Sequence, residues 1–180
     1  MILFFGPAGA GKSVQGQMLA EKEGWQWIST GKLFRESQDP EVQSVLSQGL
    51  LMTSEKTQNV LAEVLDQTRS RQIILDGFPR KVEQAEWLVS HQTEYDYTVD
   101  LGVVLDVSKE EILERLAIRG RAEDDPAVIE KRLQIYHSEV DPILEYLTKQ
   151  GVPIVRTNGI GKVDDIHEQI VKEIAMAKLV

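Results

Sequence analysis

Residues 6–13 read GPAGAGKS and directly follow the apolar run Met1–Phe5. They satisfy the pattern G-x-x-x-x-G-K-[ST], in the position between a strand and a helix that this pattern requires. Glycines let the backbone wrap closely around a phosphate with its N–H groups pointing inward, and the positive end of the following helix adds to the attraction. We therefore expect Lys12 to reach the outer phosphates of a nucleotide and Ser13 to bind magnesium through its hydroxyl. The alternative is a glycine-rich turn without a ligand, which the flanking strand and helix disfavour.

Beyond this motif, short apolar runs alternate with longer segments of helical periodicity, an order typical of βαβ units. Each run is short and apolar enough for a strand covered on both faces, so we expect one parallel sheet. With 180 residues and 42% hydrophobic content, the chain fits a single domain with a proper core. The prediction is a three-layer α/β fold over residues 1–180, with a five-stranded parallel sheet flanked by helices. The expected strands are Met1–Phe5, Trp25–Ile28, Ile73–Leu75, Leu101–Val107 and Val152–Arg156.

Helical periodicity fills the intervals between these strands. Apolar residues recur at three- or four-residue spacing from Pro126 onward, which predicts a helix that Pro142 bends or ends. A helix is also expected over residues 110–119, and another over 162–179 packs an isoleucine face on the sheet. Residues 30–69 are helical in pattern and contain no expected strand, so they form an all-helical insertion that is expected to move as a unit.

Composition narrows the classes of partner and compartment. Twenty basic and twenty-nine acidic residues leave a net charge of −9, which argues against nucleic acid as the main partner. The chain has no cysteine, and the apolar run at its N-terminus is too short for a signal peptide or a membrane span. We therefore expect a soluble, cytoplasmic protein that is a monomer by default. The three histidines are scattered, which favours surface or packing roles over metal binding.

Charged residues downstream of the motif suit phosphate chemistry. Asp76 follows an apolar run at the carboxyl edge of the expected sheet, which makes it a candidate for the magnesium shell beside Ser13. Alone, such an aspartate is more often a turn or cap residue. Phosphoryl transfer needs positive charge around the phosphate oxygens, and arginine supplies a fork of donors. The candidate arginines are Arg80, Arg115, Arg119, Arg121 and Arg132.

The arrangement of these arginines leaves an alternative open. Arg115 and Arg119 lie four apart and share one face of the expected helix 110–119. That face is equally compatible with a solvated surface on which Glu111 and Glu114 are the partners. Only folding can bring Arg121 and Arg132 together.

Four separated segments, GPAGAGKSVQ, ISTGKLFR, LDGFPRKVEQAEWL and RAEDDPAVIEKRL, resemble adenylate kinase in their order and over nearly the whole chain. Their agreement is more specific than a lone phosphate-binding loop. The resemblance implies the P-loop nucleoside monophosphate kinase fold, with a helical AMP-binding insertion at about 30–59 and a lid at about 119–125. It also implies direct, reversible transfer from MgATP to AMP giving two ADP, with Mg²⁺ as cofactor.

Site roles are carried over from the resemblance onto matching positions. Catalysis is assigned to Lys12, Arg80, Arg119, Arg121 and Arg132, and the metal to Ser13 and Asp76. The ATP side comprises Gly9, Ala10, Gly11, Lys12, Ser13, Val14, Arg115, Arg119 and Gly161. The AMP side comprises Thr30, Gly31, Arg35, Leu50, Leu51, Met52, Gly77, Phe78, Pro79, Arg80, Gln84, Arg121 and Arg132. Thr30 followed by Gly31, together with Gln84, resembles the AMP-specific form.

The sequence departs from the family pattern at several positions. Ser13 and Val14 replace a glycine and a threonine, and Trp27 stands where histidine is frequent, as a packing residue. Lys32 stands where an aspartate is associated with magnesium waters, which predicts weaker metal binding on that side. Only one residue separates Arg119 from Arg121, so the lid is nearly absent. A reduced lid predicts weaker closure over ATP, or more ATP hydrolysis without transfer.

Two other functions remain open at this point. One is a kinase of the same fold that acts on another nucleoside monophosphate or a small hydroxyl acceptor. The other is a nucleotide-binding regulator without catalysis, which Lys32 and the short lid suggest. The retained charged residues argue against the regulator, because a binder needs no charge on the transferring phosphate. These residues are Lys12, Asp76, Arg80, Arg121 and Arg132.

Overall fold

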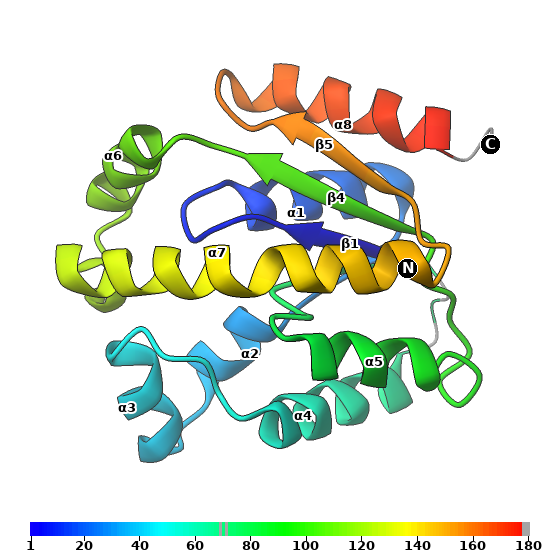
Figure 1. Cartoon of the computed structure of the whole chain (residues 1–180), viewed down its shortest axis with the longest axis horizontal. Helices are drawn as coiled ribbons and strands as arrows, with labels where there is room; N and C mark the ends of the chain where they lie inside the picture. Colours follow the sequence, from blue (N-terminus) through cyan, green and yellow to red (C-terminus); the bar gives the residue numbers. More distant parts are fainter. Residues whose placement is uncertain (69, 71, 178–180) are drawn as a thin grey trace.

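The computed structural model describes residues 1–68, 70 and 72–177. Its five strands form one parallel sheet in the order β2-β3-β1-β4-β5, with helices on both faces (Figure 1). The fold class predicted from the sequence is confirmed. The strands are β1 (Ile2–Phe5), β2 (Gln26–Ser29), β3 (Ile73–Asp76), β4 (Leu101–Asp106) and β5 (Ile154–Asn158). The helices are α1 (Lys12–Glu23), α2 (Thr30–Glu36), α3 (Pro40–Ser47), α4 (Ser54–Gln67), α5 (Val82–Ser90), α6 (Lys109–Arg119), the 3₁₀ turn η1 (Ala122–Asp124), α7 (Pro126–Lys149) and α8 (Val163–Ala177).

Successive residues of the strands point into two separate cores, which creates the three layers. Leu3 and Phe5 belong to a core that α4, α5 and α7 complete. Ile2 and Phe4 belong to the opposite core, which α1 and α8 complete. β1 lies in the middle of the sheet, and its side chains alternate between the two faces. Because helices cover both faces, every position of β1 is apolar and buried.

The first four predicted strands agree with the observed ones to within one residue at each end, whereas the last strand begins and ends two residues later than predicted. Val152 donates its N–H to the Leu147 carbonyl at 3.0 Å and so closes the turn after α7. Its side chain is buried, which explains why it resembles a strand residue in sequence. The ladder with β4 begins at Ile154 instead.

Pro142 does not end α7, which excludes one of the two outcomes predicted for it, a bend or an end. The helix runs from Pro126 to Lys149 with Pro142 inside it. A proline costs a helix one backbone hydrogen bond, about 3 kcal/mol. Val140 before it, and Ile143 and Leu144 after it, are all buried in one core, and this packing outweighs the local preference.

The chain between β2 and β3 is helical, as predicted, in the part that the structure describes. It contains α2, α3 and α4, whose first turns are capped by the side chains of Ser29, Asp39 and Thr53. Arg69, the last residue of the predicted insertion, lies outside the described residues. The predicted helix 162–179 is confirmed as α8 over Val163–Ala177, and its final two positions also lie outside the described residues.

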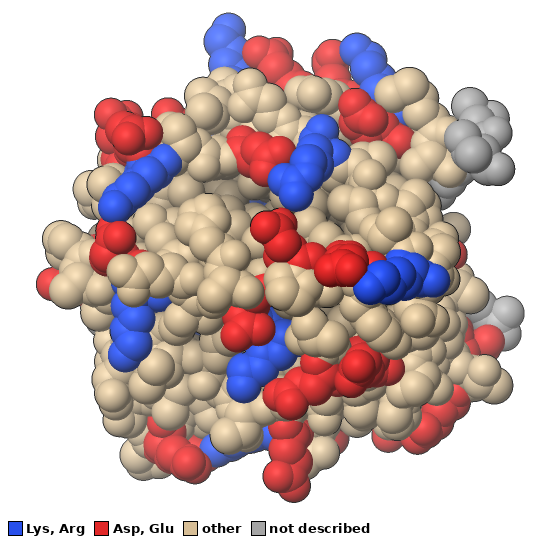
Figure 2. All heavy atoms as spheres, in the orientation of Figure 1, with Lys and Arg blue, Asp and Glu red and all other residues tan. Residues whose placement is uncertain are grey.

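The sheet order places a crevice at the carboxyl ends of the central strands. The chain passes from β1 toward β2 on one side and reaches β4 on the other, so β1 sits at a topological switch point, where open α/β sheets bind ligands. On the face in Figure 2, basic side chains are separated from one another by acidic and uncharged atoms. No helix in the described part of the chain combines the length and apolar character needed to cross a bilayer.

Candidate active site

A cavity of about 560 Å³ opens at the carboxyl ends of the strands. Its wall includes every site residue predicted from the sequence except Phe78. The Phe78 ring is 1% exposed and packs edge-on against Trp87, with ring centroids 6.1 Å apart. Phe78 belongs to the core between the sheet and α5, so its side chain does not contribute to the cavity.

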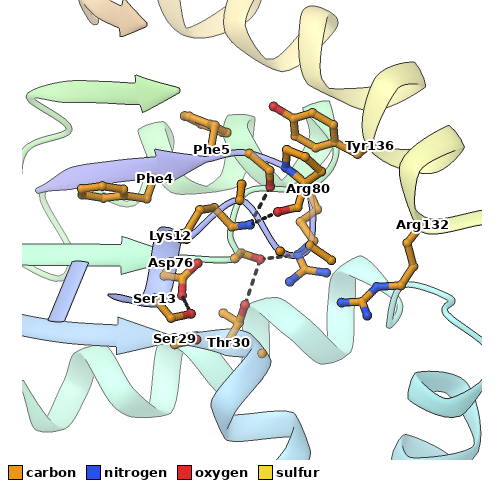
Figure 3. A pocket seen from close by; sticks show the side chains of 18 of the residues that line it. Phe4, Phe5, Lys12, Ser13, Ser29, Thr30, Asp76, Arg80, Arg132 and Tyr136 are labelled. Atoms are coloured by element: carbon orange, nitrogen blue, oxygen red, sulfur yellow. Dashed lines mark hydrogen bonds between the residues drawn. The ribbon is translucent and has the colours of Figure 1, made fainter. Parts of the chain in front are cut away.

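The phosphate-binding loop closes around the ammonium of Lys12. Its Nζ donates to the carbonyls of Gly6 at 2.6 Å and Pro7 at 2.8 Å (Figure 3). Gly9 and Gly11 have φ of 85° and 96°, in the left-handed region that side chains disfavour. Burial lowers the pKa of Lys12 to about 8, although the nearby Asp76 carboxylate acts in the opposite direction. Burial therefore disfavours the charged form of Lys12 in the ligand-free protein, and a bound anion would stabilise that charge.

Ser13 and Asp76 meet directly at the floor of the cavity. The Ser13 hydroxyl donates to Asp76 Oδ2 at 2.6 Å, and Asp76 is 3% exposed at the end of β3. The described residues contain no group of three or more histidine, cysteine or acidic side chains suited to a metal. Magnesium in phosphoryl-transfer sites is held by one or two protein oxygens together with water and substrate phosphates. The donor set of Ser13 and Asp76 fits such a site.

Arg80 is fixed beside the loop that follows β3. Its Nε donates to the Gly77 carbonyl at 2.8 Å, and the Thr30 hydroxyl donates to the same oxygen at 2.9 Å. A side chain at Gly77 would place its Cβ 3.0 Å from Arg80 Nη2, so the glycine gives the guanidinium its space. Burial lowers the pKa of Arg80. Figure 3 shows Arg80 and Arg132 directed toward the same space in front of the P-loop.

Gln84 presents an amide whose orientation is set by its neighbours. Its Oε1 accepts the backbone N–H of Arg80 at 2.7 Å, and its Nε2 lies 3.4 Å from the Ser54 hydroxyl. Gln84 is 2% exposed and lines the cavity. Because the oxygen is committed to Arg80, the group that faces a ligand is the amide donor.

Asp124 connects two of the predicted arginines. It accepts from Arg119 Nη2 at 2.5 Å and from Arg119 Nε at 2.9 Å, and it lies 4.0 Å from Arg132 Nη1. Burial acts to raise the pKa of Asp124, but the hydrogen bonds from Arg119 lower it below its usual value. The roles predicted for Arg121 and Arg132 require that folding bring them together. Both line the cavity, but the ion pair found for Arg121 is a long one, 3.9 Å to Glu123.

Arg132 belongs to the cluster of charged side chains around Asp124. Its Nη1 is buried and has no hydrogen-bond partner among the described residues. Burial, together with the nearby cations of Arg80 and Arg119, lowers the pKa of Arg132 to about 10. A buried guanidinium donor without a partner is costly, and a bound anion removes that cost.

A comparison with protein-family models bears on the function of this cluster of cations. The family model described as "Adenylate kinase" matches residues 4–152. The chain belongs to the adenylate kinase family. It is 38% identical over 172 residues to "Adenylate kinase" of Mycobacterium ulcerans (strain Agy99), covering 92% of this chain and 93% of that protein. It is 32% identical over 180 residues to "Adenylate kinase" of Synechococcus sp. (strain WH7803), covering 97% and 98%. Membership in the adenylate kinase family makes this chain a phosphotransferase.

Arg115 makes contacts that fit both interpretations that the sequence left open for it. Its Nε pairs with Glu111 at 2.7 Å, as expected for a solvated helix face. However, Nη2 donates to the Gly159 carbonyl at 2.7 Å and Nη1 contacts the Ala10 carbonyl at 3.4 Å. In this adenylate kinase family member, Arg115 therefore ties α6 to the P-loop and to the loop after β5.

Lys32, a departure from the adenylate kinase family pattern, is not among the residues that line the cavity. Its ammonium lies 3.8 Å from Glu36 and 5.8 Å from the centroid of the Trp27 ring, and its side chain is 53% exposed. Trp27 packs on the core, as predicted, and approaches Gly16 so closely that a Cβ there would lie 3.1 Å from the ring.

Two acidic residues of the site were not predicted from the sequence: Glu123, which lines the cavity, and Asp124, which pairs with Arg119. Glu123 and Asp124 both stand in the quoted motif RAEDD, close to two arginines. Their position in that motif was a usable signal, because buried arginines are normally paired.

Proposed function

We propose that the enzyme transfers a phosphoryl group reversibly from MgATP to AMP, giving two ADP. The observation that carries this proposal is the convergence of Lys12, Arg80 and Arg132 on one space in front of the P-loop. The transferring phosphoryl group spreads negative charge over its oxygens, and fixed cations around it stabilise the transition state more than the ground state.

The donor nucleotide is proposed to bind along the P-loop side. Gly9, Gly11 and the start of α1 offer backbone N–H groups to its phosphates, and Lys12 leaves its carbonyl partners to reach them. Arg115, Arg119 and Gly161 are proposed to complete this side. Arg119 must then exchange its contacts with Asp124 for contacts with phosphate.

The acceptor is proposed to lie between α2 and α5. Arg80 would grip its phosphate, and the guanidinium of Arg35 lies on the same wall beside Gly31. Leu50, Leu51 and Met52 line the wall nearby, where backbone contact to the nucleotide is proposed. The amide donor of Gln84 matches the N1 acceptor on the adenine edge, which favours AMP.

Ser13 and Asp76 are proposed to hold Mg²⁺, which would neutralise charge on the phosphates as they rearrange. The protein residues then only position groups and supply charge, so direct in-line transfer needs no covalent intermediate on the enzyme. We further propose a cytoplasmic monomer with ATP, AMP and ADP as its partners, and size-exclusion chromatography tests the monomer.

The proposal is tested with a coupled assay of the purified protein with MgATP and each of AMP, GMP, CMP and UMP. We expect rapid formation of diphosphate with AMP and at least about tenfold less with the others, since one mismatched hydrogen bond in a closed site costs 1–3 kcal/mol. Faster turnover with another monophosphate would establish a different acceptor. Tight ATP binding without transfer to any of them would favour the non-catalytic regulator.

A further inference from the structure

Side chains of other elements hold the loop between β5 and α8, residues 159–162, at its first residue and hold Val163, the first residue of α8, just after it. Arg115 donates to the carbonyl of Gly159 at 2.7 Å. At the other end, Gln15 Nε2 donates to the carbonyl of Val163 at 2.9 Å. Both donors also belong to the phosphate-binding region, because Arg115 contacts Ala10 and Gln15 lies on α1 one turn after Lys12. The two bonds therefore couple this loop to the P-loop.

His167 in turn orients Gln15. The amide nitrogen of Gln15 can only donate and the Val163 carbonyl can only accept, so their bond fixes which way the amide points. Gln15 Oε1 then faces His167 Nδ1, 3.3 Å away, and Nδ1 must carry the proton. Burial lowers the pKa of His167, which keeps the ring neutral in this tautomer.

Packing alone does not account for a histidine at this position. His167 is 2% exposed, and its Nε2 is buried without a hydrogen-bond partner in the described part of the chain. It lies on α8 beside Ile166 and Ile170, where an apolar side chain would fill the space without burying a ring nitrogen. What the ring contributes that leucine does not is the bond to Gln15.

We propose that His167 is a positioning residue for the ATP side of the active site. By holding the Gln15 amide, it fixes Val163 and with it the loop around Gly161, both of which line the cavity. This inference rests on the proposed placement of ATP against the P-loop and Gly161. Loss of the bond frees the Gln15 amide to rotate, which loosens the loop without touching the acceptor side.

The test compares His167→Leu, which removes the donor, with His167→Asn, whose amide nitrogen takes the place of Nδ1. The dissociation constant for ATP is measured by calorimetry, together with kcat and the KM values for ATP and AMP. We expect His167→Leu to weaken ATP binding about three- to tenfold, the effect of one neutral hydrogen bond, with kcat and the KM for AMP within about twofold. His167→Asn should restore ATP binding to within about twofold of the unchanged protein.

Two further variants separate positioning from general loosening of α8. Ile174→Val removes one methyl group seven residues further along α8, so it should lower the melting temperature and leave ATP binding unchanged. The double variant Gln15→Leu with His167→Leu should bind ATP as Gln15→Leu alone does, because the two residues act through one chain of bonds.

Unchanged ATP affinity in His167→Leu would overturn the inference, as would failure of His167→Asn to restore it. An equal rise in the KM for AMP would also overturn it. Calorimetry measures ATP binding without phosphoryl transfer. A wild-type protein that binds ATP but phosphorylates no AMP would overturn the proposed function, while the ATP dissociation constants of the His167 variants would still test this inference.

Discussion

Asp124 engages both arms of the Arg119 guanidinium, with Nη2 to Oδ1 at 2.5 Å and Nε to Oδ2 at 2.9 Å. The carboxylate is 3% exposed, and it also accepts the backbone N–H of Arg121 at 3.0 Å. It thus occupies a guanidinium that the proposed function assigns to the phosphates of ATP. The Arg119 donors can contact either Asp124 or the phosphates of ATP, so we expect ATP binding to break the Arg119–Asp124 ion pair.

Asp124→Asn should make the ligand-free protein less stable and its stabilisation by ATP larger. The variant weakens the pair that neutralises Arg119 and relieves Arg132, which should cost about 1–3 kcal/mol without ligand. Phosphates would then no longer compete with a carboxylate. Thermal unfolding with and without ATP measures both effects. Asp106→Asn is the matched control, since Asp106 pairs with Arg156 at 3.0 Å while both are 53% exposed, and it should change either quantity little.

Lys12 should give the enzyme an alkaline limb near pH 8. Its pKa is lowered from 10.5 to about 8 by burial, so the free enzyme loses this charge above that pH. We expect kcat/KM for ATP to fall as the pH rises through 8, since that ratio reports the free enzyme. The limb of kcat should lie at higher pH, because bound phosphates favour the charged form. A flat kcat/KM profile up to pH 9.5 would contradict this assignment.

The same residue predicts a stability change of defined sign. Between about pH 8 and 10.5 the unfolded chain binds the Lys12 proton and the folded chain does not. The free energy of unfolding should therefore rise with pH in that window. Lys12→Met should remove this rise and leave the ligand-free protein at least as stable below pH 8, while reducing kcat about a thousandfold. Equal losses of melting temperature and activity would argue for a structural role instead.

The sequence predicted the parts of this molecule that local pattern determines. The P-loop, the strand β1 and the helix face of Ile166, Ile170 and Ile174 each follow from residues close together in the chain. Local pattern could not decide whether Pro142 bends or ends α7, because the apolar contacts that keep the helix continuous come from other elements.

Contacts across long separations could not be predicted from spacing. Ser13 and Asp76 were both chosen, but only the parallel register of β1 and β3 places them 2.6 Å apart. Nothing in the spacing of the arginines says which of them Asp124 holds. The pair of Gln15 and His167 spans 152 positions, and no local signal marks either residue as the partner of the other.

Gln84→Glu should damage the acceptor side selectively. The carboxylate still accepts the N–H of Arg80 but replaces the amide donor by an acceptor, which repels the acceptor edge of adenine. We expect the KM for AMP to rise about 10- to 100-fold, equivalent to 1–3 kcal/mol, with the KM for ATP within about threefold. Steady-state kinetics with each nucleotide varied in turn measures the two values. Glu86→Gln on the same helix is the control and should leave both unchanged. A parallel rise in both KM values in Gln84→Glu would show that the change disturbs the whole cavity.

Asp76→Asn should separate metal use from nucleotide binding. Asp76 is 3% exposed and accepts the Ser13 hydroxyl at 2.6 Å, so the variant removes the only charge in the proposed metal pair. We expect the magnesium concentration for half-maximal activity to rise at least about tenfold, because hard cations prefer carboxylate oxygen. Binding of metal-free ATP in a chelator should be as tight or tighter, since a carboxylate that repels phosphate is gone. Calorimetry with and without chelator measures the two effects, and Asp141→Asn, at a site 81% exposed, is the control. If Asp76→Asn weakened metal-free ATP binding as much as magnesium use, its role would be to hold the P-loop rather than the metal.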